Sequence, residues 1–278
     1  MIKINEKLTI FHDDNSVFAE YSDELLGFDR DAASLTFITA EDSIYVGFYK
    51  PINIFFSELA TTNTNDADLT VEYYNGTAFT NVVGLHDDSK AFTRSGFTRW
   101  DRNQADEAAT TINSVELFWY KIDLDADSSA MVFDGLNIVF SDDQDLKREL
   151  FEIDKYLPAN TATHILSHAS ARDEIIQKLN IMGKDKNNAV TGWLEGITAF
   201  DLLDISEVKL ASTYLVLSKI LFSVSDDLDD VFASKSITYR SMADNIINST
   251  KLSVDSNDNG VEEQNEAAIF TVGRILRL

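Results

Sequence analysis

The first half of the chain alternates short apolar runs with polar turns, a pattern typical of β-strands. Leu69–Tyr74 shows it best, because apolar and polar side chains take turns from Leu69 to Tyr73. Strands are also predicted at Ser34–Ile38, Ser43–Tyr49, Ile52–Leu59, Ser114–Asp123 and Leu136–Phe140. Turns are predicted at Asn75-Gly76, Asp134-Gly135 and Thr61–Asp68. Because no helical segment separates these strands, the pattern predicts an antiparallel β-sandwich.

From about residue 144 the apolar period changes to that of a helix. Helices are predicted at Asp145–Leu157, Thr163–Leu179, Asp204–Val224 and Asp229–Asn248. Asp204 and Glu207 have the spacing of a capping box at the start of the third helix. Four helices with short connections indicate a bundle. We therefore expect an α+β protein, with an N-terminal antiparallel β-sandwich in residues 1–143 and a C-terminal α-helical bundle in residues 144–278.

Composition narrows the possible partners. The 278 residues are 44% hydrophobic, which is typical of a globular chain, and cysteine is absent. No run of eighteen apolar residues is present, so no membrane span is expected. Residues 1–143 carry nine Lys or Arg against 26 Asp or Glu, a net of −17, and residues 144–278 carry 14 against 21, a net of −7. The total of −24 disfavours direct nucleic-acid readout, because such a surface repels phosphates.

One stretch matches the twelve-residue calcium-loop pattern. The predicted ligands are the side chains at loop positions 1, 3, 5 and 12 and the backbone carbonyl at position 7. These residues are Asp255, Asn257, Asn259, Glu266 and, for the carbonyl, Val261. Glu262 departs from the pattern, because position 8 is normally apolar, and no second loop of this kind is present. The alternative is an Asx-rich turn whose side chains bond their own backbone.

Other candidates for chemistry are weaker. His164 and His168 are four residues apart on a predicted helix, a spacing that zinc sites use, but surface or capping histidines explain them better. No nucleophile elbow, phosphate-binding loop or dinucleotide fingerprint occurs, and no carboxylate pair stands out, so we expect no enzyme. The aromatic segments Tyr73–Phe79 and Gly96–Asp101 are similar to sugar-stacking modules, although most of their rings are expected in the core.

Three blocks of the helical half resemble the head-to-tail connector (neck adaptor) proteins of tailed bacteriophages. The resemblance spans about residues 145–278. The blocks are Tyr156–Pro158 with Ala169–Ile176; Phe200–Asp204 with Leu210–Phe222; and Lys235–Arg240 with the Asp/Asn/Gly loop and the basic end Gly273–Leu278. The β half is similar to accessory sandwiches of phage neck, baseplate and tail proteins, which the smallest connectors lack.

The resemblance implies a structural virion protein, assembled in the host cytoplasm. Such proteins form a homo-oligomeric ring, often twelve-fold, that docks on the portal and on adjacent neck and tail proteins. Their helices build the ring, and their C-terminal segment reaches the portal. Here that segment is the arm Ile269–Leu278, whose alternating pattern suits addition as a strand or docking in a groove. The arm residues expected to contact a partner are Ile269, Phe270, Val272, Arg274, Ile275 and Arg277.

Two alternatives to the connector role stay open. The first is a carbohydrate- or receptor-binding tail or baseplate protein that acts through the β-sandwich. The second is a glycan hydrolase, since paired carboxylates are easily accommodated in so acidic a chain. For the arm, the alternative is a last strand or helix that folds back on its own chain.

Overall fold

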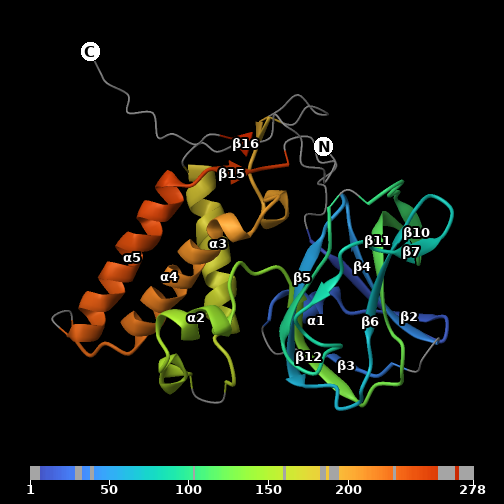
Figure 1. Cartoon of the computed structure of the whole chain (residues 1–278), viewed down its shortest axis with the longest axis horizontal. Helices are drawn as coiled ribbons and strands as arrows, with labels where there is room; N and C mark the ends of the chain where they lie inside the picture. Colours follow the sequence, from blue (N-terminus) through green and yellow to red (C-terminus); the bar gives the residue numbers. More distant parts are fainter. Residues whose placement is uncertain are drawn as a thin grey trace. The chain divides into compact units, whose positions relative to one another are not determined.

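The structure is a computed structural model of the chain. It describes residues 7–28, 33–37, 41–102, 104–158, 161–181, 186–187, 194–227, 230–255 and 267–268. Among them, contacts divide the chain into two compact units: unit 1 ends at Ile138, and unit 2 begins at Val139. Strands and helices are both abundant, so the expected α+β class is confirmed (Figure 1).

The described residues of unit 1 form two antiparallel sheets and one short helix. The larger sheet has the order β2-β1-β4-β11-β6-β7, with β10 paired to β11. Its strands are β1 (Thr9–Asp14), β2 (Val17–Glu20), β4 (Asp42–Phe48), β6 (Leu69–Tyr74), β7 (Phe79–Asn81), β10 (Thr110–Ile112) and β11 (Val115–Leu124). The smaller sheet has the order β3-β12-β5-β9-β8. Its strands are β3 (Ala33–Leu35), β12 (Met131–Asn137), β5 (Ile54–Thr61), β9 (Gly96–Arg99) and β8 (His86–Asp87), and the helix is α1 (Ser22–Leu26).

Aromatic rings join the two sheets. The buried Trp100 ring lies between Phe55 of β5, at 6.0 Å, and Tyr120 of β11, at 4.9 Å between ring centroids. The Tyr120 hydroxyl also accepts a hydrogen bond of 2.9 Å from the backbone N–H of Ile52. Tyr120 is fully buried, so this bond satisfies a polar group that would otherwise be costly to bury.

A second core lies on the other face of the larger sheet. Buried Phe11, Tyr45, Ile112 and Trp119 pack there, and the Phe11 and Trp119 rings stack with centroids 5.3 Å apart. Trp119 lies opposite Gly47 of β4. A Cβ at residue 47 would lie 2.5 Å from the Trp119 ring, so only glycine leaves room for the indole.

Two hairpins turn on Asn-Ser pairs. Asn15-Ser16 joins β1 to β2, and Asn113-Ser114 joins β10 to β11. All four residues have positive φ, between 45° and 70°. Two central residues in this region form a type I′ turn, whose twist matches that of the flanking strands. Ser114 therefore belongs to a turn, whereas the sequence predicted that a strand begins there.

The predicted turn at Asp134-Gly135 is wrong. Both residues lie inside β12, where the pairing with β5 shifts register. A Cβ at Gly135 would lie 2.1 Å from the buried Phe28 ring. The glycine thus serves close packing against an aromatic ring within an irregular strand.

Unit 2 is mainly helical. Its elements are α2 (Asp143–Glu149), η1 (Ile153–Tyr156), α3 (Ile165–Ile181), η2 (Ala199–Asp201), α4 (Ser206–Ser223) and α5 (Val231–Ser249), with short strands β13 (Lys186–Asn187), β14 (Leu194–Glu195), β15 (Leu252–Ser253) and β16 (Ala267–Ala268). Helix α4 is the most buried and packs against α2, α3 and α5 (Figure 1). None of the helices among the described residues combines the length and apolarity needed to cross a membrane.

Each of the four predicted helices begins two residues away from its predicted start, since the observed starts are Asp143, Ile165, Ser206 and Val231. The first helix begins at Asp143 behind a capping box of Asp142 and Asp145, and it ends at Glu149 instead of reaching Leu157. The capping box predicted at Asp204 and Glu207 is wrong. The Glu207 carboxylate instead accepts hydrogen bonds of 2.7 and 3.0 Å from the backbone and hydroxyl of Ser253, so it ties β15 to the start of α4.

Candidate functional site

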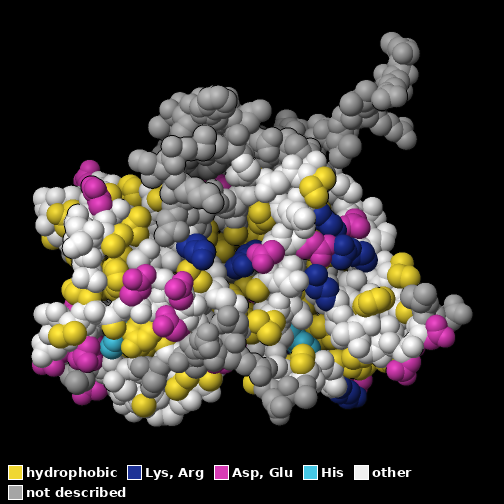
Figure 2. Space-filling view, turned by 180° about the vertical axis from the view of Figure 1, so that it is seen from behind, with side chains coloured by type: hydrophobic (Ala, Val, Ile, Leu, Met, Phe, Trp, Pro, Cys, Tyr) yellow, Lys and Arg dark blue, Asp and Glu magenta, His cyan; other side chains and the backbone are white. Residues whose placement is uncertain are grey.

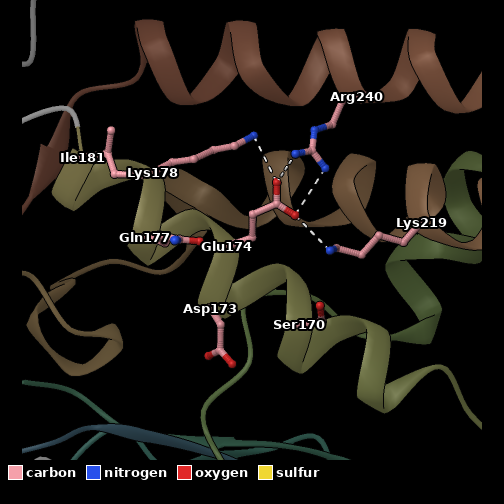
Figure 3. A pocket seen from close by; sticks show the side chains of 8 residues that line it. All are labelled: Ser170, Asp173, Glu174, Gln177, Lys178, Ile181, Lys219 and Arg240. Carbon is pink, nitrogen blue, oxygen red and sulfur yellow. Dashed lines mark hydrogen bonds and ion pairs between the residues drawn. The ribbon is translucent and has the colours of Figure 1, made fainter.

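A charged pocket opens on unit 2 between three helices. Its volume is about 570 Å³. Helix α3 contributes most of the lining, and α4 and α5 contribute one cation each (Figure 3). The lining residues are Ser170, Asp173, Glu174, Gln177, Lys178, Ile181, Lys219 and Arg240. The pocket is therefore built from segments that lie far apart in the sequence.

Glu174 is the centre of the pocket. Its carboxylate lies 2.9 Å from the Lys219 ammonium and 3.3 Å from that of Lys178. The Arg240 guanidinium contacts both carboxylate oxygens, with Nη1 at 3.2 Å from Oε2 and Nη2 on Oε1 (Figure 3). Lys178 also pairs with Asp244 of α5. We call Glu174, Lys178, Lys219 and Arg240 the ion cluster.

The ion cluster keeps Glu174 ionised. Burial alone would raise the pKa of this carboxyl, but the hydrogen bond from Lys219 and the charges of Lys219, Arg240 and Lys178 hold the pKa below its ordinary value. Lys and Arg side chains gather on this face of unit 2 with a few carboxylates among them (Figure 2). The arrangement surrounds the Glu174 carboxylate with hydrogen-bond donors from three helices, and only part of each cation is used by a carboxylate, so it suits the binding of a polar group.

The sequence shows only part of this cluster. Glu174 and Lys178 have the i,i+4 spacing of a helical ion pair. Arg240 pairs with Glu174 across 66 positions, and no spacing in the chain points to that contact. Lys219 likewise comes from a different helix, so the cluster is a product of tertiary packing.

Unit 2 also contains a buried Ser-His-Asp array. The His168 Nδ1 lies 2.9 Å from the Ser141 hydroxyl, and its Nε2 lies 3.1 Å from the Asp143 carboxylate. Ser141 also bonds Ser212 of α4 at 2.8 Å. Ser141 is 0% exposed, so no substrate reaches its hydroxyl, and we interpret the array as a structural link between α2, α3 and α4.

The prediction of surface histidines is wrong, although His164 stands at the cap position before α3, where its carbonyl accepts from the backbone N–H groups of Ser167 and His168. His164 and His168 are 2% and 1% exposed. Neither ring nitrogen of His164 makes a hydrogen bond of normal geometry to another described residue. Burial lowers the pKa of His164, while the Asp143 charge and the Ile153 backbone oppose that shift only in part. His164 is therefore held in the form that carries no charge.

Unit 1 contains a half-buried carboxyl group with a raised pKa, that of Glu107. Glu107 accepts a hydrogen bond from the Tyr120 hydroxyl. Burial raises the pKa of Glu107 to about 7, although the Tyr120 bond and the charge of Arg102 act in the opposite direction. Perturbed carboxyls are typical of active sites, but structural pairs produce the same shift.

Glu107→Gln is expected to stabilise unit 1 in alkaline solution. The folded pKa of about 7 lies above the ordinary 4.5. Glu107 therefore contributes stability fully below pH 4.5, and that contribution is lost as the pH rises through 7. A neutral glutamine keeps the bond to Tyr120, so the variant should gain about 2 kcal/mol over wild type at pH 8 and nothing at pH 4. Urea unfolding at both pH values measures the gain. The exposed Glu116→Gln is the control, and equal behaviour of both variants would contradict the assignment.

The predicted calcium loop lies mostly outside the described residues. Among its ligands only Asp255 is described, and it is buried, with its backbone N–H donating to the Asp201 carbonyl at 2.8 Å. Asn257, Asn259, Val261 and Glu266 are not described. Strands β15 and β16, which flank the predicted loop in the sequence, pair Ser253 with Ala267. Among the described residues, no group of three or more His, Asp or Glu side chains is placed to hold a metal.

Calcium is expected to stabilise the chain through Asp255. A ligand at about 100 times its dissociation constant adds about 2.7 kcal/mol to the free energy of unfolding. Thermal melts with millimolar calcium and with a chelator should therefore differ for wild type and coincide for Asp255→Ala. Asp226→Ala, which removes an exposed carboxylate outside the loop, should keep the calcium response. Identical melts of wild type with and without calcium would show that the loop is only a turn.

The remaining predicted contact residues fall into two groups. Those of the arm, from Ile269 to Arg277, lie outside the described residues. In the aromatic segments Tyr73, Phe97 and Trp100 are buried, as expected for core rings. Only Tyr74 and Phe79 are half-buried, in an edge-to-face pair at 5.7 Å.

Comparisons with known proteins give little further guidance. No family model and no curated protein matches the chain. Among solved structures, the chain is similar to a family 89 glycoside hydrolase from Clostridium perfringens, in complex with 2-acetamido-1,2-dideoxynojirmycin, at 14% identity and a TM-score of 0.25. The match covers 65% of this chain and only 20% of that one. A likeness of this size carries no argument about fold or activity.

Proposed function

We propose that this protein is a structural virion protein, a head-to-tail connector of the neck adaptor type. Several copies assemble into a ring that docks on the portal and on adjacent neck or tail proteins. On this proposal unit 1 is an accessory β-sandwich, unit 2 is the helical-bundle connector domain, and the arm Ile269–Leu278 reaches the portal. The protein catalyses no reaction.

The position of the resemblance blocks carries this proposal. The blocks contribute segments to three different helices of unit 2. These segments are Ala169–Ile176 in α3, Leu210–Phe222 in α4 and Lys235–Arg240 in α5. Each supplies one member of the ion cluster: Glu174, Lys219 and Arg240 (Figure 3). Separate parts of the resemblance therefore meet at one surface pocket, which supports a shared working surface.

Exposed apolar side chains give independent support. Among the described residues, ten large apolar side chains are exposed, and eight of them lie in unit 2. These eight are Phe151, Leu166, Ile181, Leu210, Phe222, Val231, Ile237 and Met242. Exposed apolar side chains are common singly, but this bias towards one unit is expected when that unit contacts partners.

Assembly of the purified chain tests the proposal. We expect ring-shaped particles in negative-stain images and multimers in mass photometry, with attachment to portal protein from the same genome in a pull-down. The double variant Phe222→Ser with Ile237→Ser should assemble less well. The matched control, Val17→Ser with Val83→Ser in unit 1, should assemble normally. A chain that stays monomeric and ignores the portal would contradict the connector role.

The carbohydrate-binding alternative has narrower support. Most of the aromatic side chains that suggested carbohydrate binding lie in the core. Among them only Tyr74 and Phe79 are partly accessible. Retention on a glycan array that is lost in Tyr74→Ala would favour this alternative over the connector.

A further inference from the structure

The ion cluster holds more hydrogen-bond donors than its own carboxylates use. Lys178 and Lys219 each carry three N–H groups and Arg240 carries five. The contacts described above occupy only the two oxygens of Glu174 and one oxygen of Asp244. The side chains of Lys178, Lys219 and Arg240 are 25%, 30% and 42% exposed. The pocket can therefore donate to an incoming anion while Glu174 stays in place.

The rim of the pocket suits a protein surface. Gln177 and Ser170 add uncharged polar groups, Asp173 adds a carboxylate that is already paired with Arg172, and Ile181 is 77% exposed. An arginine, an apolar contact and polar groups around it are the usual ingredients of a protein interface. An Arg guanidinium also matches the two oxygens of a carboxylate, which it binds in a fork geometry.

The chain itself supplies carboxylates in excess. Residues 1–143 carry 26 Asp or Glu against nine Lys or Arg. A free phosphate polymer is a poor occupant, because a chain with a net charge of −24 repels an extended polyanion. A protein surface brings only the few carboxylates that meet the cations, together with apolar surface for Ile181.

We propose that this pocket is a docking site for a carboxylate-bearing surface of unit 1 from a second copy of this chain. The inference rests on the proposed function, because it requires copies to assemble, and it names the two surfaces that meet. These surfaces differ, so every copy offers both halves of the contact. Such a heterologous contact closes into a ring when its rotation permits and otherwise continues as a filament.

The charges predict an unusual salt dependence. At about 0.01 M salt the screening length is about 30 Å, so the whole negative charge of one copy repels the other. At about 0.15 M salt the screening length falls to about 8 Å, which removes the long-range repulsion and preserves close ion pairs. At about 1 M salt the exposed pairs weaken as well. Assembly should therefore be strongest at intermediate salt.

Zero-length cross-linking tests the inference on the full chain. Equal amounts of ¹⁴N- and ¹⁵N-labelled protein are mixed, allowed to exchange copies, and treated with a carbodiimide that joins an amine directly to a carboxylate. We expect mixed-isotope peptides that link Lys178 or Lys219 to an Asp or Glu in residues 7–137. Mixed-isotope links from these lysines only to carboxylates of unit 2, or no mixed-isotope links from them at all, would overturn the inference.

Charge-removing variants give a second readout. Lys219→Gln and Arg240→Gln keep most of the side-chain volume. Each should raise, by at least tenfold, the protein concentration below which assemblies dissociate, as measured by mass photometry. The control Lys235→Gln removes an exposed cation from α5 outside the pocket and should leave that concentration unchanged. Pocket variants that keep the wild-type melting temperature and assemble like wild type would refute the inference.

The outcomes separate this inference from the connector role. If rings form but the cross-links from Lys178 and Lys219 do not reach carboxylates of unit 1, the connector role remains supported and the docking site is refuted. A wild-type chain that is monomeric at intermediate salt but attaches to portal would also overturn the docking site alone. A chain that neither assembles nor attaches would remove both.

Discussion

Trp119→Ala is expected to lower the free energy of unfolding of unit 1 by about 4 kcal/mol, because truncating a large buried aromatic leaves a cavity. The indole is 1% exposed, stacks on Phe11 and donates its N–H to the Val115 carbonyl at 3.2 Å. It fills the second core on the outer face of the larger sheet. Urea unfolding measures this loss of free energy when it is monitored by the circular dichroism of the backbone, a signal that does not depend on tryptophan.

Gly47 gives this prediction a matched partner. Gly47→Ala alone should cost about 2 kcal/mol, because its Cβ would lie 2.5 Å from the Trp119 ring. In the Trp119→Ala background the same methyl group enters the vacated space and should cost nothing. The double-mutant cycle therefore predicts a coupling of about 2 kcal/mol. Additive losses would show that the two residues do not compete for space.

Asp143→Ala is expected to cost about 3 kcal/mol in unit 2, because it leaves buried donors without their acceptor. The carboxylate bonds His168 Nε2 at 3.1 Å and the His164 backbone N–H at 3.2 Å. Burial alone would raise the pKa of Asp143, but the hydrogen bond and charge of His168, together with the hydrogen bond from the His164 backbone N–H, hold it below the ordinary 3.8. Its stabilisation is therefore present above pH 3.8 and is lost as the pH falls through the lower folded value.

Two measurements check this assignment. The gap in unfolding free energy between wild type and Asp143→Ala should be full at pH 7 and should narrow in strong acid. Asp154→Ala is the control, because its pair with Lys147 is 3.0 Å long but half-exposed, and such pairs contribute at most about 1 kcal/mol. Equal losses in the two variants would mean that burial of the Asp143 contacts is unimportant.

Strands with clear alternation were predictable from the sequence, and hairpins with unusual turns were not. The strand Leu69–Tyr74 was predicted with the bounds that the structure gives. The β1–β2 hairpin was missed because its turn is Asn15-Ser16, whereas Asn-Gly is the common signal for a type I′ turn. At Asp134-Gly135 the sequence carries a common turn signal but forms no turn. Its glycine makes room for the Phe28 ring instead of reversing the chain.

The apolar period of the sequence predicted the helices of unit 2, but it did not predict the ion cluster. Periodicity places Glu174 and Lys178 on one helix face, while the register between helices decides that Lys219 and Arg240 meet them. Burial of His164 and His168 was missed because a histidine carries no apolar signal in the sequence. Contacts between distant helices depend on packing, and packing is not encoded in any local spacing.

Because of Glu107 and His164, the stabilities of the two units depend on pH in opposite directions. Protonation of buried His164 is disfavoured, so the stability of unit 2 falls as the pH drops below the unfolded value of 6.5. Ionisation of half-buried Glu107 is disfavoured, so the stability of unit 1 falls as the pH rises from 4.5 through about 7. In calorimetry, two heat-absorption peaks would then move in opposite directions across this range. The direction in which a peak moves identifies the unit that melts, without cutting the chain or adding a probe.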